Sequence, residues 1–335
     1  MQKMQGIEVY QALSRGAVLF DRSDRMRMRV AGAKAAELVN GMVTSDVVSL
    51  TPGRGQYSAA LTAKGKIVAD PRIFLTDDGI LVDVGAAAAP GWRDMVAKYV
   101  NPRVAPYSDV TSETRCLSVA GGNAAALLAA QLGFDIAALK SLEPYSHLTG
   151  ESNGAKVMIV RTPEISAECY DVICAAPAGD SIRARILEGG AQEGDAQLWM
   201  VLRIEAGRPE WGADMSDTTL PQEALLDELG AISFTKGCYI GQEVVARIHF
   251  RGHVNKLLRK LRFVTSSLPQ PGAAVVDDSG AIVGDVRSIA VSPKCGGVAL
   301  GMIRREVEPG STLHARWDGG EASVQVAGEK KGATA

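Results

Sequence analysis

Residues 236–247 read KGCYIGQEVVAR, and the run continues as IHFRGHVNKLLRKLR to residue 262. This stretch holds seven Lys or Arg residues and one acid, Glu243, so it carries a charge of +6. The other residues hold 29 bases and 37 acids, which leaves −2 for the whole chain of 335 residues. A concentrated positive field in an otherwise acidic chain favours an anionic partner, such as a carboxylate-bearing cofactor, phosphates or an acidic protein. The alternative is a solvated basic face.

The composition sets wider limits. A near balance of charge over the whole chain argues against a protein that coats nucleic acid, so we expect no stable nucleic-acid binding. Charged residues make up 22% and hydrophobic residues 46%, which is typical of a folded protein. Neither a secretory leader nor a membrane-spanning stretch is indicated, and the five cysteines are scattered without a CxxC pair. We therefore expect a cytoplasmic protein with no disulfide framework and no resident metal.

Cys238 is the first candidate for chemistry. Gly237 and Gly241 bracket it and permit a tight turn, and the following GQEVVARI has helical periodicity. A thiol near Lys236 and a helix N-terminus would have its thiolate favoured, whereas the alternative is a small buried cysteine that packs a turn.

Strand and helix patterns alternate as far as residue 255 and then change. Beyond Lys256, short apolar runs separated by Pro, Gly and Asp predict a small β-barrel or sandwich. Before it, we expect a hairpin, a helix with Asp180 as N-cap and two further helices. The hairpin would join Ile67–Leu75 to Ile80–Val84, and the two helices would span Ala124–Leu132 and Gln197–Ala206.

The KGCYIGQEVVAR motif resembles the signature of the YgfZ-type folate-binding proteins, which is K-G-C, an aromatic residue, any residue, G-Q-E and then a basic residue. RIEAGRPEWGAD (203–214), LPQEA (220–224) and ISFTKGC follow the order of that family. Upstream, residues 41–74 are similar to the N-terminal block of the glycine cleavage system aminomethyltransferase. The motif residues here are Lys236, Gly237, Cys238, Tyr239, Gly241, Gln242, Glu243 and Arg247.

The resemblance implies an α+β fold arranged as a three-domain cloverleaf. Two α+β folate-binding subdomains, at 1–110 and 111–255, would surround a folate-sized central hole. A C-terminal β-barrel would occupy 256–328, and residues 329–335 would form a disordered tail.

The resemblance also implies tetrahydrofolate, or a one-carbon-substituted folate, as the cofactor. Trp199 matches a tryptophan that lines the folate site, although a helical tryptophan can equally face the core. Arg25 stands at the family's other aromatic position, and Arg203 belongs to the cofactor-binding set. Asp171, with Glu168 as its competitor, stands where the transferases place a pterin-binding acid. Asp70 is near their acid–base aspartate, but an aspartate before Pro71 is also an ordinary turn residue.

By this resemblance, the protein supports the assembly or repair of iron–sulfur enzymes, including enzymes that thiolate tRNA. Its partners would be folate and those enzymes or their assembly machinery, with Cys238 acting at the folate site. One alternative is a folate-dependent aminomethyl or one-carbon transferase that uses Asp70. Another is a non-enzymatic module that docks a protein or RNA through the basic stretch.

Overall fold

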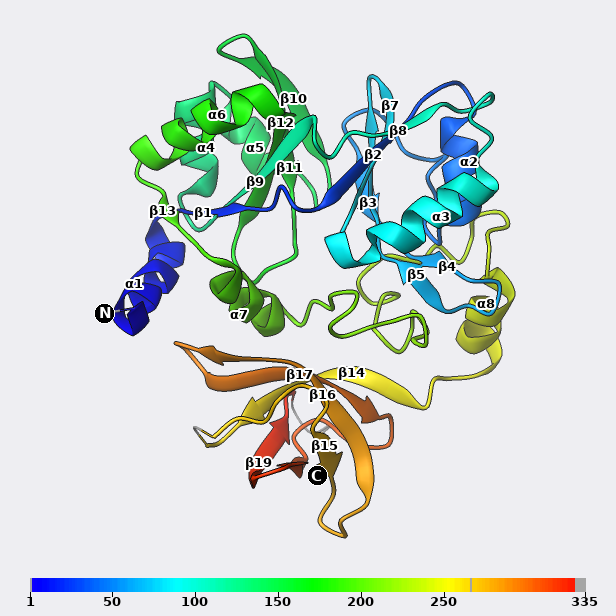
Figure 1. The fold of residues 1–335 in the computed structure, drawn as a ribbon, viewed down its shortest axis with the longest axis vertical. Helices are drawn as coiled ribbons and strands as arrows, with labels where there is room; N and C mark the ends of the chain where they lie inside the picture. The colour runs from blue at the N-terminus through cyan, green and yellow to red at the C-terminus, as the bar shows by residue number, and fades with distance from the viewer. Residues whose placement is uncertain (1, 266, 329–335) are drawn as a thin grey trace, which may run out of the picture.

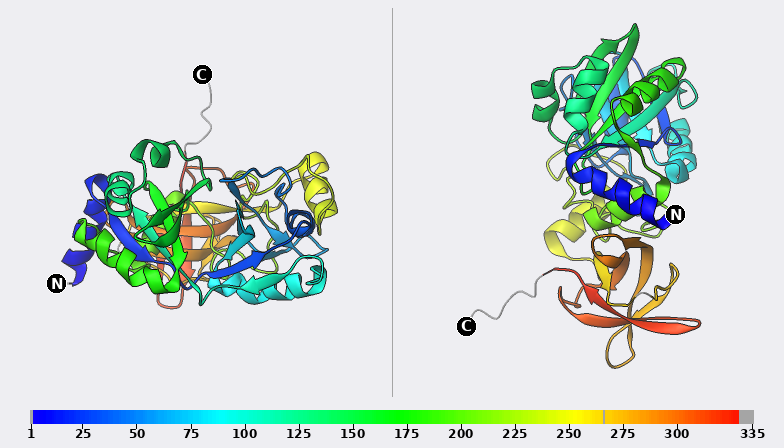
Figure 2. Two further views of the ribbon diagram at one scale, coloured as in Figure 1. Left: turned by 90° about the horizontal axis from the view of Figure 1, so that it is seen from above. Right: turned by 90° about the vertical axis from the view of Figure 1, so that its left-hand side faces the viewer.

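Two α+β lobes lie side by side, with a β-barrel beneath both (Figures 1 and 2). The structure, a computed structural model, describes residues 2–265 and 267–328. The predicted disordered tail, 329–335, lies outside the described residues. The predicted α+β class with a C-terminal β-barrel is confirmed.

The first lobe is built on a five-stranded antiparallel sheet, with the order β3-β6-β7-β2-β8. Two helices pack against one face of this sheet, and a separate two-stranded sheet pairs β4 with β5. The strands are β2 (Met26–Val30), β3 (Gly55–Tyr57), β4 (Ala60–Leu61), β5 (Ile67–Ala69), β6 (Arg72–Thr76), β7 (Gly79–Val84) and β8 (Tyr107–Asp109). The helices are α2 (Ala35–Met42) and α3 (Ala89–Tyr99), and the short 3-10 turn η1 (Ala86–Ala88) precedes α3.

The second lobe is built on a six-stranded sheet, with the order β10-β11-β12-β9-β1-β13. Only the β1–β13 pair is parallel in this sheet. The strands are β1 (Val18–Asp21), β9 (Thr114–Ala120), β10 (His147–Ser152), β11 (Ala155–Arg161), β12 (Cys169–Ala175) and β13 (Gln192–Glu193). The helices are α1 (Gln2–Arg15), α4 (Ala124–Leu132), α5 (Ile136–Ser141), α6 (Ala176–Glu188) and α7 (Ala196–Ala206).

Alternation along the strands explains how the lobes pack. Ile73 of β6 faces the helices of its own lobe, whereas the next residue, Phe74, faces the second lobe. In β12, Val172 joins the core under α4 and α6, and Ile173 joins the core between the lobes. Because successive side chains point to opposite faces, each sheet is buried on both sides. Each of these buried side chains contributes about 1.5–3 kcal/mol.

Six strands close the barrel in the order β14-β17-β16-β15-β18-β19. Its interior is filled by Val, Leu, Ile and Ala side chains with Phe263. Helix α7 packs against β16 and β17, and α8 (Gln242–Arg251) leads from the first lobe into β14. The strands are β14 (Lys256–Phe263), β15 (Ala274–Val276), β16 (Ile282–Ser292), β17 (Gly296–Arg304), β18 (Thr312–Trp317) and β19 (Gly320–Val326).

Two local predictions were wrong. The predicted strand Ile67–Leu75 is split into β5 and β6, because Pro71 has no N–H to give to a sheet. Helix α6 begins at Ala176 with a proline in its first turn, so Asp180 lies inside the helix rather than at its N-cap. The proline ring fixes φ at a value that suits the first turn of a helix, so the helix starts earlier than the Asp180 N-cap predicted. The predicted helices Ala124–Leu132 and Gln197–Ala206 agree with α4 and, within one residue, with α7.

Candidate functional site

A cavity of ≈ 220 Å³ lies where the two lobes meet α7 and the loop that follows it. Four of the residues singled out in the sequence line it: Arg25, Asp70, Trp199 and Arg203. The structure adds Arg22, Asp24, Tyr57, Tyr145, Glu164, Arg208, Glu210 and Trp211, together with small or apolar neighbours. We call this space the central cavity.

Trp199 is positioned by a well-capped helix. The Asp195 side chain accepts a hydrogen bond from the backbone N–H of Leu198 at 2.8 Å, and Gly207 ends α7 in the left-handed region with φ 73°. The indole is buried, and the guanidinium of Arg22 lies 4.0 Å from its ring centroid. This cation–π contact fixes the ring at the cavity wall and brings a positive charge beside it.

Asp70 follows β5 and is held by an aromatic pair. Its Oδ2 accepts a hydrogen bond from the Tyr57 hydroxyl at 3.0 Å, and the Tyr57 ring stacks on Tyr145 with centroids 6.0 Å apart. Burial raises the pKa of Asp70 from 3.8 to about 7, and neighbouring Arg25 only partly opposes this rise. The carboxyl group therefore gains and loses its proton near neutral pH, which suits a general acid or base.

Glu164 is another carboxylate of the central cavity, and its pKa shifts in the opposite direction. Its Oε1 lies 3.1 Å from Nη1 of Arg72. Burial would raise the pKa of Glu164, but three nearby arginines, Arg72 foremost, lower it to about 2. Glu164 thus stays ionised while Asp70 titrates near pH 7. Such a divergence between two neighbouring acids is a feature of acid–base sites.

A buried ion network joins the two lobes next to the cavity. Asp83 of β7 accepts hydrogen bonds from Arg25 at 2.5 Å and from Arg72 at 2.9 and 3.0 Å. Arg72 also donates to Asp171 of β12, in the other lobe, at 2.5 Å. The structure therefore places Asp171 in a cross-lobe ion pair, and Asp171 is not among the described residues that line the cavity.

Arg203 lines the cavity while it ties three segments together. It is buried on α7, and its guanidinium donates to the Arg208 carbonyl at 2.7 Å and to Ser288 of the barrel at 2.8 Å. It also pairs with Asp214, whose carboxylate is fully buried. Arg203 thus holds the loop after α7 against the barrel.

Glu168 lies elsewhere. Its carboxylate accepts a hydrogen bond from the Tyr170 hydroxyl at 2.8 Å and lies 3.5 Å from Arg161. It lines a second, larger cavity beside the barrel rather than the central cavity.

Lys236 fastens the cysteine motif to the first lobe. Its ammonium donates to the carbonyls of Asn40, Val43 and Ser45 at 2.7, 2.9 and 2.7 Å. These carbonyls belong to the last turn of α2 and the residues after it, where a cation is favourable. Burial lowers the pKa of Lys236 from 10.5 to about 8. The lysine side chain therefore serves as a C-terminal cap for α2.

The rest of the motif continues this docking and exposes one side chain. Tyr239 is buried in the core between the lobes, and Gly241 has φ +84°, where a Cβ would lie 2.6 Å from the Thr62 carbonyl oxygen. Only glycine fits that position. Gln242 begins α8, with Glu243 and Arg247 exposed along it. Cys238 is exposed between these anchors and is not among the described residues that line the central cavity.

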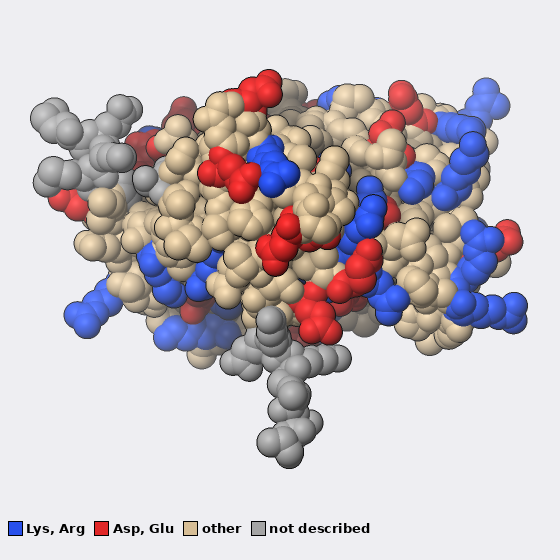
Figure 3. Space-filling view, turned by 90° about the horizontal axis from the view of Figure 1, so that it is seen from below, with Lys and Arg blue, Asp and Glu red and all other residues tan. Residues whose placement is uncertain are grey.

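The basic stretch is divided among several surfaces. Lys236 is buried, Arg247 and Arg251 lie on α8, and the remaining cations lie along β14. Seen from the barrel end, acidic side chains gather across the middle of the molecule and basic ones towards its edges (Figure 3). Helix α8 ends at Arg251. Within residues 2–265 and 267–328, no group of three or more His, Cys, Asp or Glu side chains is placed to hold a metal.

The chain is similar to known proteins over most of its length. Residues 3–235 match the family model described as the GCVT N-terminal domain. The tRNA-modifying protein YgfZ of Klebsiella pneumoniae (strain 342) is 30% identical over 307 residues, which cover 88% of this chain and 88% of that protein. The chain is a member of the YgfZ family.

Further relatives agree with this assignment. The tRNA-modifying protein YgfZ of Escherichia coli O45:K1 (strain S88 / ExPEC) is 32% identical over 244 residues, covering 72% of this chain and 71% of that protein. The glycine cleavage system aminomethyltransferase T from Bartonella henselae matches the fold with a TM-score of 0.85 at 20% identity, covering 96% of this chain and 88% of that one. The resemblance inferred from KGCYIGQEVVAR is therefore confirmed at the level of family and fold. None of the helices among the described residues is long and apolar enough to cross a membrane.

Several residues that line the central cavity were not predicted from the sequence. Glu164 lies in the same TPEISAE segment as Glu168, and an acid four positions earlier was the available signal. Tyr145 has a positive φ of 64°, and the neighbouring sequence does not predict this conformation. Tyr57 and Arg208 come from segments far apart in the chain, and only the fold brings them together.

Proposed function

We propose that the central cavity binds a folate, tetrahydrofolate or a one-carbon-substituted form, and that the protein uses it to support the assembly or repair of iron–sulfur enzymes. Clients that thiolate tRNA are included in this proposal. The relatives named tRNA-modifying proteins, and the fold shared with an aminomethyltransferase, support it. The observation that supports it most is that one aromatic cavity contains both an ionised carboxylate, Glu164, and two hydrogen-bond donors, Tyr145 and Trp211, that have no partner in the part of the chain that the structure describes.

The residues of the cavity fit a pterin ring. Glu164 supplies an ionised acceptor for the amino and ring N–H groups of the pterin. Among the described residues, the Tyr145 hydroxyl and the Trp211 indole N–H are buried without a hydrogen-bond partner, so they are free for the polar edge of a ligand. The volume of ≈ 220 Å³ is below the about 300–1,000 Å³ of pockets that enclose whole drug-sized ligands. It therefore suits the ring, with the rest of the molecule reaching outward.

Arginines provide for the anionic tail. Arg22 and Arg208 line the cavity, and the Arg208 guanidinium lies 5.9 Å from the Tyr57 ring centroid. A planar guanidinium binds a carboxylate through two parallel hydrogen bonds. We propose that these two side chains receive the glutamate end of the ligand.

Asp70 supports a second candidate function, a folate-dependent aminomethyl or one-carbon transferase. A reduced folate supplies a nitrogen that carries the one-carbon unit. Asp70 can hold or release a proton at its Oδ2 near neutral pH, and the Tyr57 hydroxyl keeps the carboxyl group in place. This observation favours proton transfer in the cavity, whereas the exposed motif cysteine favours the accessory role.

In the accessory role, we propose that Cys238 meets a macromolecular client. The thiol is exposed, and a Cβ at Gly237 would meet nothing within 4 Å, so the backbone beside the thiol is open to approach. Lys236 and Tyr239 hold the loop on either side. Cys238 would act there as a nucleophile, a redox group or a transient ligand.

Calorimetric titration with tetrahydrofolate under anaerobic conditions tests the binding. We expect saturable binding that Glu164→Gln weakens by about 10- to 100-fold, the loss for a hydrogen bond to a charged group. Glu168→Gln is the matched control, because it lies in the same segment but outside the central cavity, and it should bind like wild type. An absence of binding at millimolar folate, or equal affinity of the two variants, contradicts the proposal.

Complementation of a strain that lacks its own YgfZ-family protein separates the two functions. Cys238→Ser should keep the fold and the folate affinity but fail to complement. If Cys238→Ser complements and Asp70→Asn does not, the transferase becomes the better assignment. Turnover of an aminomethylated lipoyl carrier with tetrahydrofolate, lost in Asp70→Asn, would establish it.

A further inference from the structure

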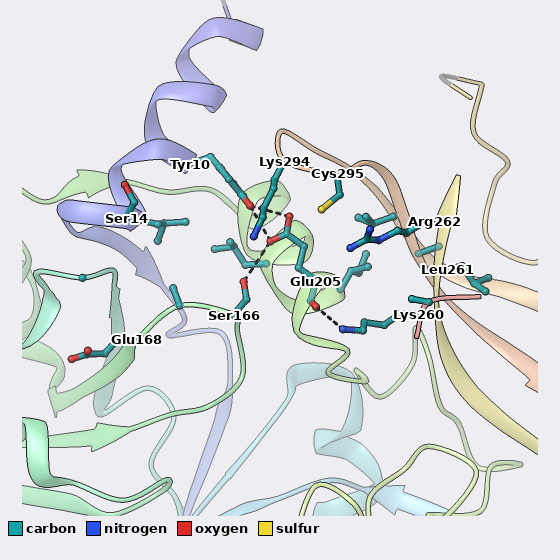
Figure 4. Close-up of a pocket in the computed structure, with 18 residues that line it drawn as sticks. Tyr10, Ser14, Ser166, Glu168, Glu205, Lys260, Leu261, Arg262, Lys294 and Cys295 are labelled. Carbon is teal, nitrogen blue, oxygen red and sulfur yellow. Dashed lines mark hydrogen bonds between the residues drawn. The ribbon is translucent and has the colours of Figure 1, made fainter. Parts of the chain in front are cut away.

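A second cavity, of ≈ 570 Å³, lies between α1, α7 and the barrel, and we call it the barrel cavity (Figure 4). Helix α7 separates it from the central cavity. Trp199 and Arg203, four residues apart, line the central cavity, whereas Leu202 and Glu205, three residues apart, line the barrel cavity. One helix thus contributes different side chains to the two cavities.

The floor of the barrel cavity is apolar. It is formed by buried side chains of α1, α7 and the barrel strands, and its volume falls in the range of about 300–1,000 Å³ typical of sites for small organic molecules. Buried members of this floor are Leu13, Leu202, Ile204, Leu261, Val298 and Ala299.

Glu205 of α7 is a polar anchor of the barrel cavity. Its carboxylate accepts hydrogen bonds from the Tyr10 hydroxyl at 3.1 Å, from Ser292 at 2.5 Å and from Ser166 at 3.4 Å. The Lys260 ammonium donates to the Glu205 backbone carbonyl at 3.3 Å. Figure 4 shows Glu205 between Tyr10, Ser166 and Lys260. The carboxylate is therefore stabilised by hydroxyl groups and leaves the cations of the cavity free for other anions.

Positive charge is in excess around the cavity. Of the two acids that line it, Glu168 is already close to Arg161, which lies outside the lining. Within the described part of the chain, the side chains of Arg262 and Lys294 form no ion pair, and both are exposed to solvent at the cavity. The three cations of the lining are Lys260, Arg262 and Lys294.

We propose that the barrel cavity binds a small amphipathic anion, an acyl or aryl group that carries one carboxylate, sulfonate or phosphate. The apolar body lies on Leu13, Leu202 and Val298, and the anionic end meets Arg262 and Lys294. An apolar floor beside uncompensated cations favours this class over a neutral or a cationic molecule. This site is independent of the proposed folate site, because the two cavities share no lining residue.

The fluorescent anion 8-anilinonaphthalene-1-sulfonate is a direct probe of the folded full-length protein. We expect saturable binding, displaced by decanoate and by decyl phosphate below their micellar concentrations but not by decyltrimethylammonium. The relative potency of decanoate and decyl phosphate shows whether the site prefers a carboxylate or a phosphate. The double variant Arg262→Gln/Lys294→Gln should lose at least about tenfold in affinity, the loss for charge-assisted contacts.

Two variants control this experiment. Lys256→Gln removes a cation from the same strand outside the cavity, and Arg208→Gln removes one from the central cavity. Both should bind the probe like wild type, and circular dichroism should show that all variants are folded. Equal displacement by the cationic amphiphile, unchanged affinity of the double variant, or a loss confined to Arg208→Gln overturns the proposal.

Cys295 gives a second readout at the same place. It is half-buried and lines the barrel cavity, while Cys116, Cys169 and Cys174 are buried. In the Cys238→Ser variant, Cys295 is therefore the accessible thiol for a disulfide reagent such as dithiobis(nitrobenzoate). Decanoate at saturating concentration should slow its modification at least about tenfold, matching its occupancy of the site. Modification at an unchanged rate contradicts the assigned position.

Discussion

Replacing Asp70 by Asn should stabilise the protein, and should do so more at pH 8 than at pH 5. Burial raises the pKa of Asp70 from 3.8 to about 7. The native state therefore holds this proton more tightly than the unfolded chain does. The free energy of unfolding then falls as the pH rises from about 4 through about 7, and it levels off above that window. Asparagine keeps the shape and accepts the Tyr57 hydrogen bond, but it carries no charge.

The size of the effect follows from the same pKa. Each pKa unit is worth about 1.4 kcal/mol, so the interval from 3.8 to about 7 corresponds to an upper limit of about 4 kcal/mol. The Asp70 side chain is partly exposed to solvent, which screens its charge, so we expect about half of that limit, or about 2 kcal/mol, at pH 8. At pH 5 the native Asp70 is still protonated and only a small part of the window from about 4 to about 7 has been crossed, so the expected gain in the free energy of unfolding falls below about 1 kcal/mol.

Urea unfolding of wild type and Asp70→Asn at pH 5 and pH 8 measures this difference. The matched control is Asp24→Asn, because Asp24 lines the same cavity but is exposed. Its removal should change the free energy of unfolding by less than about 0.5 kcal/mol at either pH. If Asp70→Asn is no more stable than wild type at pH 8, or if its advantage is the same at both pH values, Asp70 does not titrate near neutrality and the acid–base argument fails.

Three further predictions concern stability, each read from urea or thermal unfolding. Gly241→Ala should lower the free energy of unfolding by about 1–3 kcal/mol, because φ is left-handed there and the new Cβ would meet the Thr62 carbonyl oxygen. Gly237→Ala should be nearly neutral, and similar losses in the two variants would contradict the strain argument. Arg72→Met should cost about 3–5 kcal/mol, because Asp171 is left without a cationic partner in a buried position and Asp83 keeps only Arg25 and Arg27. Arg93→Met, which breaks an exposed pair with Asp109, should cost less than about 1 kcal/mol, and equal losses would show that the cross-lobe network contributes little. Lys236→Met should cost at least about 2 kcal/mol, since three carbonyls lose a charged donor, and full stability would mean that water replaces it.

Local patterns predicted the elements that carry the site. The periodicity of Gln197–Ala206 and the glycine after it gave α7 to within one residue, and so placed Trp199 on a helix. Turn residues at close spacing beyond Lys256 predicted the barrel, which closes between β14 and β19. These features depend on neighbours in the sequence, which is why they can be recognised without the fold.

Long-range partners could not be predicted in the same way. Arg72 binds Asp83 eleven positions away and Asp171 ninety-nine positions away, and nothing local marks these residues as a set. The sequence favoured Lys236 as a neighbour that activates the thiol. In the structure its ammonium binds carbonyls more than 190 positions away, because the unpaired end of α2 offers acceptors that the exposed loop does not.

The motif loop and Asp70 are attached to the same small element. Gly241 packs against the Thr62 carbonyl and Gly65 of the β4–β5 hairpin, and β5 ends at Ala69, directly before Asp70. The hairpin thus connects the loop that exposes Cys238 to the acid that lines the central cavity. The proposed folate would act on one end of this element through the charge of Asp70, and the proposed client at Cys238 would act on the other. If the two sites are coupled, folate alters the reactivity of the Cys238 thiol in wild type but not in Asp70→Asn. Equal thiol reactivity in wild type and Asp70→Asn, each with and without folate, would show that the two sites work separately.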